Sequence, residues 1–238
     1  MDAPPPDYYA ILEIAETATT QQVRDAYKKA ALKTHPDRVP ADSPERVTRT
    51  RKFQLVNDAY YTLSDTQRRR EYDAQRKIFG TSTGATAGDP WEDVDEEVPP
   101  QAGPNAQNAY SWAWNFFTGG QGNNQQQREQ ANNQQFGDVF EEMLREEGMA
   151  EEGTNRPTST FWGTIGGISG GALGFIVGNM GGALAGAVAG NRLGAVRDAK
   201  GKSVYSVFQD LPQADRARLL TQLAAKVFSH TGFHGSVN

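Results

Sequence analysis

The residues of this chain best suited to chemistry are three consecutive ones, His35, Pro36 and Asp37. A histidine beside a carboxylate can act as an acid–base pair or supply two ligands to a metal ion. Alternatively, a rigid tripeptide can be a shape that another protein recognises. No nucleophile or third group accompanies the tripeptide in the sequence, and both chemical roles would need one. We therefore favour recognition, and we expect no catalytic residues and no enzyme.

Composition points the same way. The chain has no Cys, which excludes a disulfide framework, a thiolate zinc site and a cysteine nucleophile. His230 and His234 are spaced four apart, but Gly232 lies between them and no further ligand is evident, so we expect no metal. No phosphate-cradling motif is present, and we expect no cofactor. Residues 1–77, 78–156 and 157–238 carry net charges of +2, −11 and +4, and none of these regions has the strong positive charge of a dedicated nucleic-acid binder, so we expect no nucleic-acid partner.

Helices must position the tripeptide. Thr19 and Gln22 form a capping box, which predicts a helix from about Thr20 to Thr34. Pro36 lacks an N–H and disfavours a helical backbone at the residue before it, so the tripeptide should begin an exposed loop. A narrow apolar stripe suited to close helix packing runs along this helix: Val23, Ala26, Ala30 and Ala31.

Three further helices are indicated up to about residue 77. Asp7 can cap a first short helix, and Ser43 followed by Pro44 is a strong start for another. Ser64 and Gln67 form a second capping box, which predicts a short basic helix after it. The helix after Pro44 carries apolar residues at intervals of three and four: Phe53, Val56, Tyr60 and Leu63. The pattern predicts an all-α fold.

Residues 7–77 resemble the J domain of the DnaJ-like co-chaperone family. The strings that carry the resemblance are "DYYAILEI", "VRDAYKKAALKTHPDR", "KFQLVNDAYYTLSD" and "RRREYD", in the order and spacing of that family. A His-Pro-Asp tripeptide alone is weak evidence, whereas the tripeptide between these helices is highly specific. The resemblance implies a four-helix J domain with the tripeptide between its second and third helices.

The resemblance also implies a partner. In this family the tripeptide loop and the basic face of the preceding helix dock on a 70-kDa heat-shock chaperone and stimulate its ATPase. The Asp of the tripeptide engages an Arg of that partner, so His35, Pro36 and Asp37 would be the trigger. A basic stripe would steer the chain toward an acidic partner, although such a stripe can also be only a solvated face. The residues expected to complete the chaperone-binding site are Arg24, Tyr27, Lys28, Lys29, Lys33 and Arg38.

Residues 78–156 have the composition of a disordered linker. They carry 14 Asp/Glu against 3 Lys/Arg, a net charge of −11, and much of the stretch is Gln- and Asn-rich. Short helical islands are expected at 110–117 and 136–147. The second island resembles the Asp-hydrophobic-Phe segments that fold back over some J domains and regulate them. Both alternatives stay open: a regulatory segment or a passive spacer.

Residues 157–198 contain a glycine at every fourth position from Gly166 to Gly194, and residues 157–191 carry no charge. This register resembles a glycine-zipper helical hairpin, in which helices approach closely because side chains are missing. The segment suits either a membrane hairpin or a soluble zipper that self-associates; we favour the soluble or peripheral one. Residues 199–230 are expected to be helical, with an apolar face made of Leu219, Leu220, Leu223, Val227 and Phe228.

The leading hypothesis is a J-domain co-chaperone whose C-terminal module gives self-association or targeting to a membrane or other location. The alternative is a structural or membrane-remodelling protein in which the glycine hairpin is the main functional element. Unfolded client proteins are the further partners that a co-chaperone would meet. The N-terminus has neither a basic segment nor an apolar run, so we expect no cleaved secretory signal and a cytoplasmic protein that can associate with a membrane.

Overall fold

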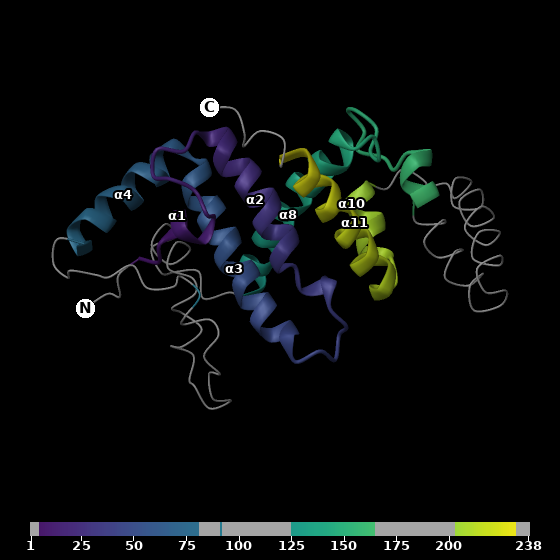
Figure 1. Ribbon diagram of the computed structural model, residues 1–238, viewed down its shortest axis with the longest axis horizontal. Helices are drawn as coiled ribbons and strands as arrows, with labels where there is room; N and C mark the ends of the chain where they lie inside the picture. Colours follow the sequence, from purple (N-terminus) through teal and green to yellow (C-terminus); the bar gives the residue numbers. More distant parts are fainter. Residues whose placement is uncertain (1–4, 81–90, 92–124, 165–202, 232–238) are drawn as a thin grey trace. The chain divides into compact units, whose positions relative to one another are not determined.

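The structure, a computed structural model, describes residues 5–80, 91, 125–164 and 203–231 (Figure 1). Within these ranges the regular structure is helical and contains no strand, only an isolated antiparallel bridge between Ala150 and Pro157. The prediction of an all-α fold is confirmed. The chain divides into two compact units, one of Met1–Pro36 with Asp42–Phe136 and one of Asp37–Ala41 with Gly137–Asn238.

The first unit contains the four helices expected of a J domain. They are α1 (Tyr8–Ile11), α2 (Thr20–Thr34), α3 (Glu45–Ser64) and α4 (Thr66–Gly80). Helices α2 and α3 lie side by side, and α4 continues from the end of α3 (Figure 1). The last helix extends three residues beyond the predicted end at residue 77.

Of the four predicted helix starts, the caps at Asp7 and Thr19 are confirmed, and α3 begins at Glu45 directly after Pro44. The fourth helix is present, but its predicted cap at Ser64 is wrong. The Asp7 carboxylate accepts hydrogen bonds from the backbone N–H groups of Tyr9 and Ala10, and Thr19 with Gln22 forms the reciprocal capping box. The helix after Ser64 is instead capped by Asp65, whose Oδ1 accepts from the N–H groups of Gln67 and Arg68 at 3.0 and 2.9 Å. The reason is that α3 runs through Ser64, so its backbone is helical and cannot serve as an N-cap.

The core of the first unit joins the predicted stripes of α2 and α3. Val23 and Ala31 of α2 are buried, as are Phe53, Val56 and Leu63 of α3. Ala26 and Ala30 remain partly exposed, so the apolar face of α2 is completed instead by Tyr27 and Leu32.

The two ends of this J-domain segment meet through one tyrosine of α4. The Tyr72 hydroxyl donates to Pro6 O at 2.7 Å and accepts the N–H of Tyr8 at 2.9 Å, and the rings of Tyr8 and Tyr72 stack at 4.9 Å. Burial raises the pKa of the Tyr72 phenol well above its usual range.

The arginine run of α4 mainly holds the fold. Arg69 donates to the backbone oxygens of Ala18 and Glu16 at 2.7 and 2.8 Å and to the Tyr9 hydroxyl at 2.9 Å. Arg68 donates to Tyr61 O at 2.8 Å, whereas Arg70 is exposed. Two of the three arginines therefore fasten neighbouring segments to α4.

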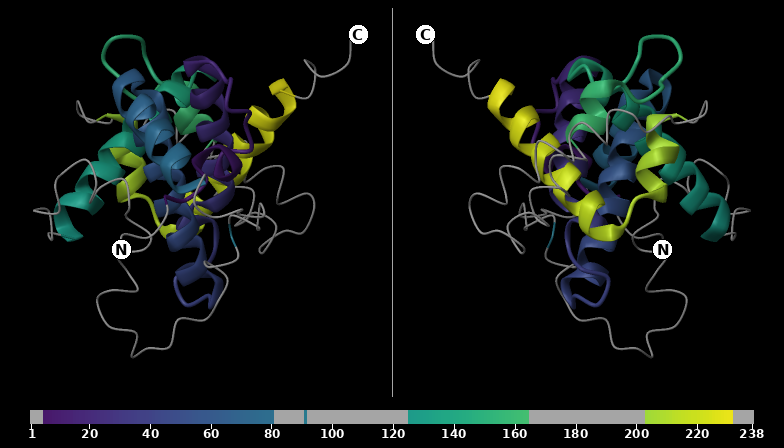
Figure 2. Two further views of the ribbon diagram at one scale, coloured as in Figure 1. Left: turned by 90° about the vertical axis from the view of Figure 1, so that its left-hand side faces the viewer. Right: turned by 90° about the vertical axis from the view of Figure 1, so that its right-hand side faces the viewer.

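In the described part of the second unit, the helices with defined bounds include two near the C-terminus, drawn in yellow-green and yellow in Figure 2. They are α10 (Val204–Asp210) and α11 (Gln213–Thr231), and the residues of α8 (Gln125–Glu146) from Gly137 onward also belong to this unit. Phe140 of α8 packs against Phe208 of α10 with 4.7 Å between ring centroids. Leu219, Leu220 and Leu223 of α11 are buried as predicted. Val227 is only partly buried and Phe228 is 41% exposed, so the apolar face of α11 ends about one turn earlier than expected.

Helix α8 is longer than the predicted island at 136–147. It begins at Gln125, inside the Gln- and Asn-rich stretch, and ends at Glu146. Gln forms helices nearly as readily as Leu, and the buried Phe136 to Leu144 face supplies packing that composition alone does not reveal. The island at 110–117 and most of the glycine-zipper segment at 157–198 lie outside the described residues. None of the described helices is long and apolar enough to cross a membrane.

Candidate partner-docking site

The tripeptide lies where the sequence predicts it, at the end of α2. His35 caps the helix with an extended backbone (φ −54°, ψ 129°), and Pro36–Arg38 form one turn of 3-10 helix. Pro36 O accepts from Arg46 Nη1 of α3 at 3.3 Å. Pro36 and the capping geometry thus end α2 and fix the direction of the loop that follows.

The tripeptide is less exposed than we expected. His35 is only 7% exposed and Asp37 only 6%. The imidazole of His35 packs between Phe53 of α3 and Phe136 of α8, with ring centroids 5.0 and 4.8 Å away, and the two phenylalanines meet edge to face at 5.3 Å. The expectation of an exposed loop is wrong for these two side chains. Phe136, about a hundred residues further along the chain, covers His35, and Asp37 is bound by Arg216 of α11.

The part of α8 that belongs to the first unit, up to Phe136, makes a second contact within that unit. Gln135 Nε2 donates to Asn57 O of α3 at 3.0 Å. Together with the Phe136 ring, this bond orders the first-unit part of α8 against α3. The His35 site is therefore made by three helices, two of which the J-domain strings include.

Asp37 belongs to the second unit together with residues 38–41, and it contacts a side chain of that unit. Its Oδ2 accepts from Arg216 Nη1 of α11 at 2.5 Å, and the Asp37 side chain is 9% exposed. Tyr205 of α10 lies close enough that its pKa is affected by this carboxylate. Burial chiefly raises the pKa of the Tyr205 phenol, and the charges of Asp37 and Glu141 raise it further.

Only some of the basic residues predicted for the docking face of α2 are exposed to solvent. Arg24 and Lys29 are partly exposed and Lys33 is exposed, so these three can meet a partner from solvent. Lys28 is only 4% exposed, and Arg38 is partly exposed in the turn after the tripeptide. The charge presented to solvent by α2 is thus smaller than the sequence suggests.

Tyr27 is a core residue in the structure. Its side chain is fully buried, its hydroxyl donates to Asn57 Oδ1 at 2.7 Å, and its ring stacks on Tyr60 with 4.2 Å between centroids. The sequence places Tyr27 on the same helical turn as the basic residues, and periodicity alone does not tell which neighbour covers it. We expected it on the docking face; the structure uses it to join α2 to α3.

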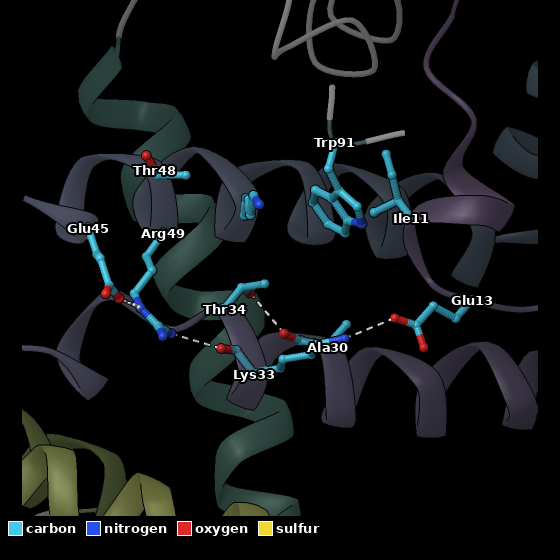
Figure 3. A pocket seen from close by; sticks show the side chains of 10 residues that line it. Ile11, Glu13, Ala30, Lys33, Thr34, Glu45, Thr48, Arg49 and Trp91 are labelled. Carbon is cyan, nitrogen blue, oxygen red and sulfur yellow. Dashed lines mark hydrogen bonds and ion pairs between the residues drawn. The ribbon is translucent and has the colours of Figure 1, made fainter. Parts of the chain in front are cut away.

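Lys33 borders a hollow of about 450 Å³ at the junction of α2 and α3 (Figure 3). Its ammonium pairs with Glu13 at 3.1 Å, and its backbone oxygen accepts from Arg49 Nη1 at 3.0 Å. Trp91 lies beside Ile11 in the lining, with Lys52 Nζ 5.5 Å from the indole centroid. The hollow has charges of both signs at its rim, and within the described ranges no group of three His, Asp or Glu could hold a metal ion.

Sequence reasoning missed the residues that cover the tripeptide. Phe136 had a weak signal, the likeness of its segment to regulatory Asp-hydrophobic-Phe segments. Arg216 and Gln213 had none, since a polar helix start gives no indication of a loop that is about 175 residues away. Only the tertiary structure brings these side chains to the loop.

Four helices of this order, with His-Pro-Asp after the second, define the J domain as a class. The comparisons agree: the family model described as DnaJ domain matches residues 7–73. A J domain-containing protein of Schizosaccharomyces pombe is 39% identical over 223 residues, which are 94% of this chain and 95% of the relative. The chain belongs to the J-domain, DnaJ-like family. No solved structure matches it.

Two further relatives match a shorter part of the chain. DnaJ homolog subfamily B member 3 of Homo sapiens is 39% identical over 92 residues, 39% of this chain and 61% of that protein. Chaperone protein DnaJ of Ruthia magnifica is 40% identical over 82 residues, 34% of this chain and 22% of that protein. These matches support a co-chaperone role with a 70-kDa heat-shock chaperone as partner, and a family whose members are typically not enzymes.

Proposed function

We propose that this protein is a co-chaperone that docks on a 70-kDa heat-shock chaperone and stimulates its ATPase. The observation that carries the proposal is the His-Pro-Asp tripeptide in its J-domain frame, at the end of α2 and held by Arg46 of α3. Asp37 supplies the carboxylate for an arginine of the chaperone. Pro36 and His35 set the position of that carboxylate.

The solvent-facing cations of α2 act in the encounter. Arg24, Lys29 and Lys33 present positive charge on one helix beside the tripeptide. Exposed charges of this kind raise the association rate and fix orientation more than they add affinity, and salt screens them. The chaperone surface that meets α2 should therefore be acidic.

The packing of Phe136 on His35 favours the regulatory reading of the linker. A chaperone that contacts the His35 ring must first displace Phe136, whose side chain is 1% exposed. The first-unit part of α8 would then act as a cover over part of the docking site. A passive spacer would have no reason to bury an aromatic side chain against the tripeptide.

We further propose that the C-terminal part determines where the chaperone is recruited. The four-residue glycine register supports self-association or attachment to a membrane or another location, in a protein that is otherwise cytoplasmic. Unfolded client proteins would reach the chaperone there. Gly170→Leu combined with Gly186→Leu should change the oligomer size or the membrane-bound fraction in sedimentation and fractionation. Unchanged values in both would remove this part of the proposal.

ATP hydrolysis tests the co-chaperone proposal. A purified 70-kDa heat-shock chaperone should hydrolyse ATP faster when the full chain is added. His35→Gln should abolish the acceleration while circular dichroism shows the native helix content. Equal acceleration by native and variant chains would show that the tripeptide is not the trigger.

A further inference from the structure

The loop that follows the tripeptide is bound by the first turn of α11. Residues 37–41 belong to the second unit although the rest of the J-domain segment belongs to the first. Three polar contacts join these residues to two side chains of α11, Gln213 and Arg216. The two residues are three positions apart, so they lie on one face of the helix.

Gln213 binds the loop backbone through both ends of its amide. Its Nε2 donates to Val39 O at 2.5 Å, and its Oε1 accepts the N–H of Ala41 at 3.1 Å. A single side chain thus satisfies a donor and an acceptor two residues apart in the loop. The pairing uses both the donor and the acceptor of the amide, which a charged Lys, Arg, Asp or Glu side chain at this position could not supply together.

Arg216 binds the side chain at the start of the loop. Its Nη1 donates to Asp37 Oδ2 at 2.5 Å, and the Arg216 side chain is 27% exposed. A charge-assisted bond in a mostly buried setting is stronger than a neutral one and is weakly screened by salt. Arg216 therefore presents to Asp37 the same chemical group that the chaperone is expected to use.

Tyr205 of α10, in the same unit, packs against residues of α8 and α10. Tyr205 lies against Gly137 of α8 so closely that a Cβ added there would lie 2.7 Å from its ring. The Tyr205 ring also meets Phe140 and Phe208, at 5.8 and 6.1 Å between centroids. Tyr205 is therefore held in a packed aromatic cluster of the second unit.

We propose that the Gln213–Arg216 face of α11 is an intramolecular binding site for residues 37–41 that competes with the chaperone for Asp37. The proposal rests on the proposed function, because it takes Asp37 as the chaperone-binding carboxylate. The Asp37 side chain is only 9% exposed while Arg216 is bound to it, so an arginine of the chaperone can reach the carboxylate only after the loop is released from α11. The C-terminal helix then sets how readily the J domain engages its partner.

Removing the arginine should favour the chaperone. With Arg216→Ala, we expect the concentration of full chain that gives half-maximal ATPase stimulation to fall about fivefold to tenfold, the order expected when one charge-assisted hydrogen bond no longer competes. Gln213→Ala should lower it by a smaller factor without changing the charge. Arg218→Ala is the matched control, since Arg218 is an exposed arginine on the same helix. It should leave the value unchanged.

Exchange of the Ala41 amide proton measures loop binding without the chaperone. It should be faster in Gln213→Ala and in Arg216→Ala than in the native chain or in Arg218→Ala, because the loop is then open more often. Circular dichroism of each variant checks that the helices remain.

The outcomes separate the two proposals. If Arg216→Ala and Arg218→Ala both behave as the native chain, or both lower the half-maximal concentration equally, the α11 site does not compete with the chaperone. If no form stimulates the chaperone, the proposed function fails. The exchange rate of the Ala41 amide proton then decides whether α11 binds the loop. Faster exchange in the two α11 variants would still establish the loop-binding site, whereas unchanged exchange would overturn it.

Discussion

Tyr27→Phe separates a packing role of this residue from the docking role that the sequence suggests. The change removes one hydroxyl and retains the ring that stacks on Tyr60. It deletes the 2.7 Å hydrogen bond to Asn57 Oδ1, an atom whose residue is fully buried. Gln135 Nε2 remains 3.5 Å from the same oxygen, which is too long to replace the lost bond.

The expected cost follows from this geometry. A buried acceptor that loses its partner destabilises a protein by about 1–3 kcal/mol, and we expect the low end, about 1–2 kcal/mol, because Asn57 keeps its weak contact with Gln135. That value corresponds to roughly a tenfold change in the unfolding equilibrium. Urea unfolding followed by circular dichroism would measure it.

A double-mutant cycle with Asn57→Ala completes this test. The two substitutions should be coupled by about 0.5–1.5 kcal/mol, since either one removes the same bond. Chaperone stimulation by Tyr27→Phe should stay near the native level under conditions where the variant is folded. If Tyr27→Phe has native stability but no longer stimulates the chaperone, the packing role is refuted and Tyr27 acts in docking.

Three further predictions concern the first unit. Arg69→Lys should lower the free energy of unfolding by about 1–3 kcal/mol in urea titrations, because lysine cannot make the three hydrogen bonds of the guanidinium at once. Arg70→Lys, at an exposed neighbouring position, should change this free energy little. Burial raises the Tyr72 pKa, so at high pH the phenol ionises first in the unfolded chain. The stability that Tyr72 contributes should be complete below about pH 10 and fall as the pH rises above that value. In the same urea titrations, Tyr72→Phe should lose less of its free energy of unfolding at alkaline pH than the native chain does. Lys29→Glu should slow association with the chaperone in stopped-flow measurements, and the native rate should fall with added salt; a rate that responds to neither change would show that the basic stripe is only a solvated face.

The local signals in the sequence predicted the J-domain helices well. Asp7, the Thr19 capping box and Pro36 act within a few residues of where they stand, so their effects on α1 and α2 can be read directly. Ser64 shows the limit of such reasoning, because the packing of Leu63 carries α3 one residue further and moves the cap to Asp65.

The tripeptide itself was also identifiable from the sequence, but its surroundings were not. Burial of His35 depends on Phe136, and the fixing of Asp37 depends on Arg216, both far along the chain. Periodicity assigns a side chain to a face of its own helix and does not tell which distant element covers that face. The burial of Tyr27 against α3 could not be predicted for the same reason.

The central claim is that Asp37 triggers the chaperone and that Arg216 limits its availability. Single-turnover ATP hydrolysis by a 70-kDa heat-shock chaperone tests it most directly, with four full-length forms: native, Asp37→Asn, Arg216→Ala and the double variant. At a subsaturating concentration we predict the largest acceleration with Arg216→Ala, a smaller one with the native chain, and none with Asp37→Asn or the double variant. Acceleration by the double variant equal to that by Arg216→Ala would contradict the account, because release of the loop would then act without the carboxylate.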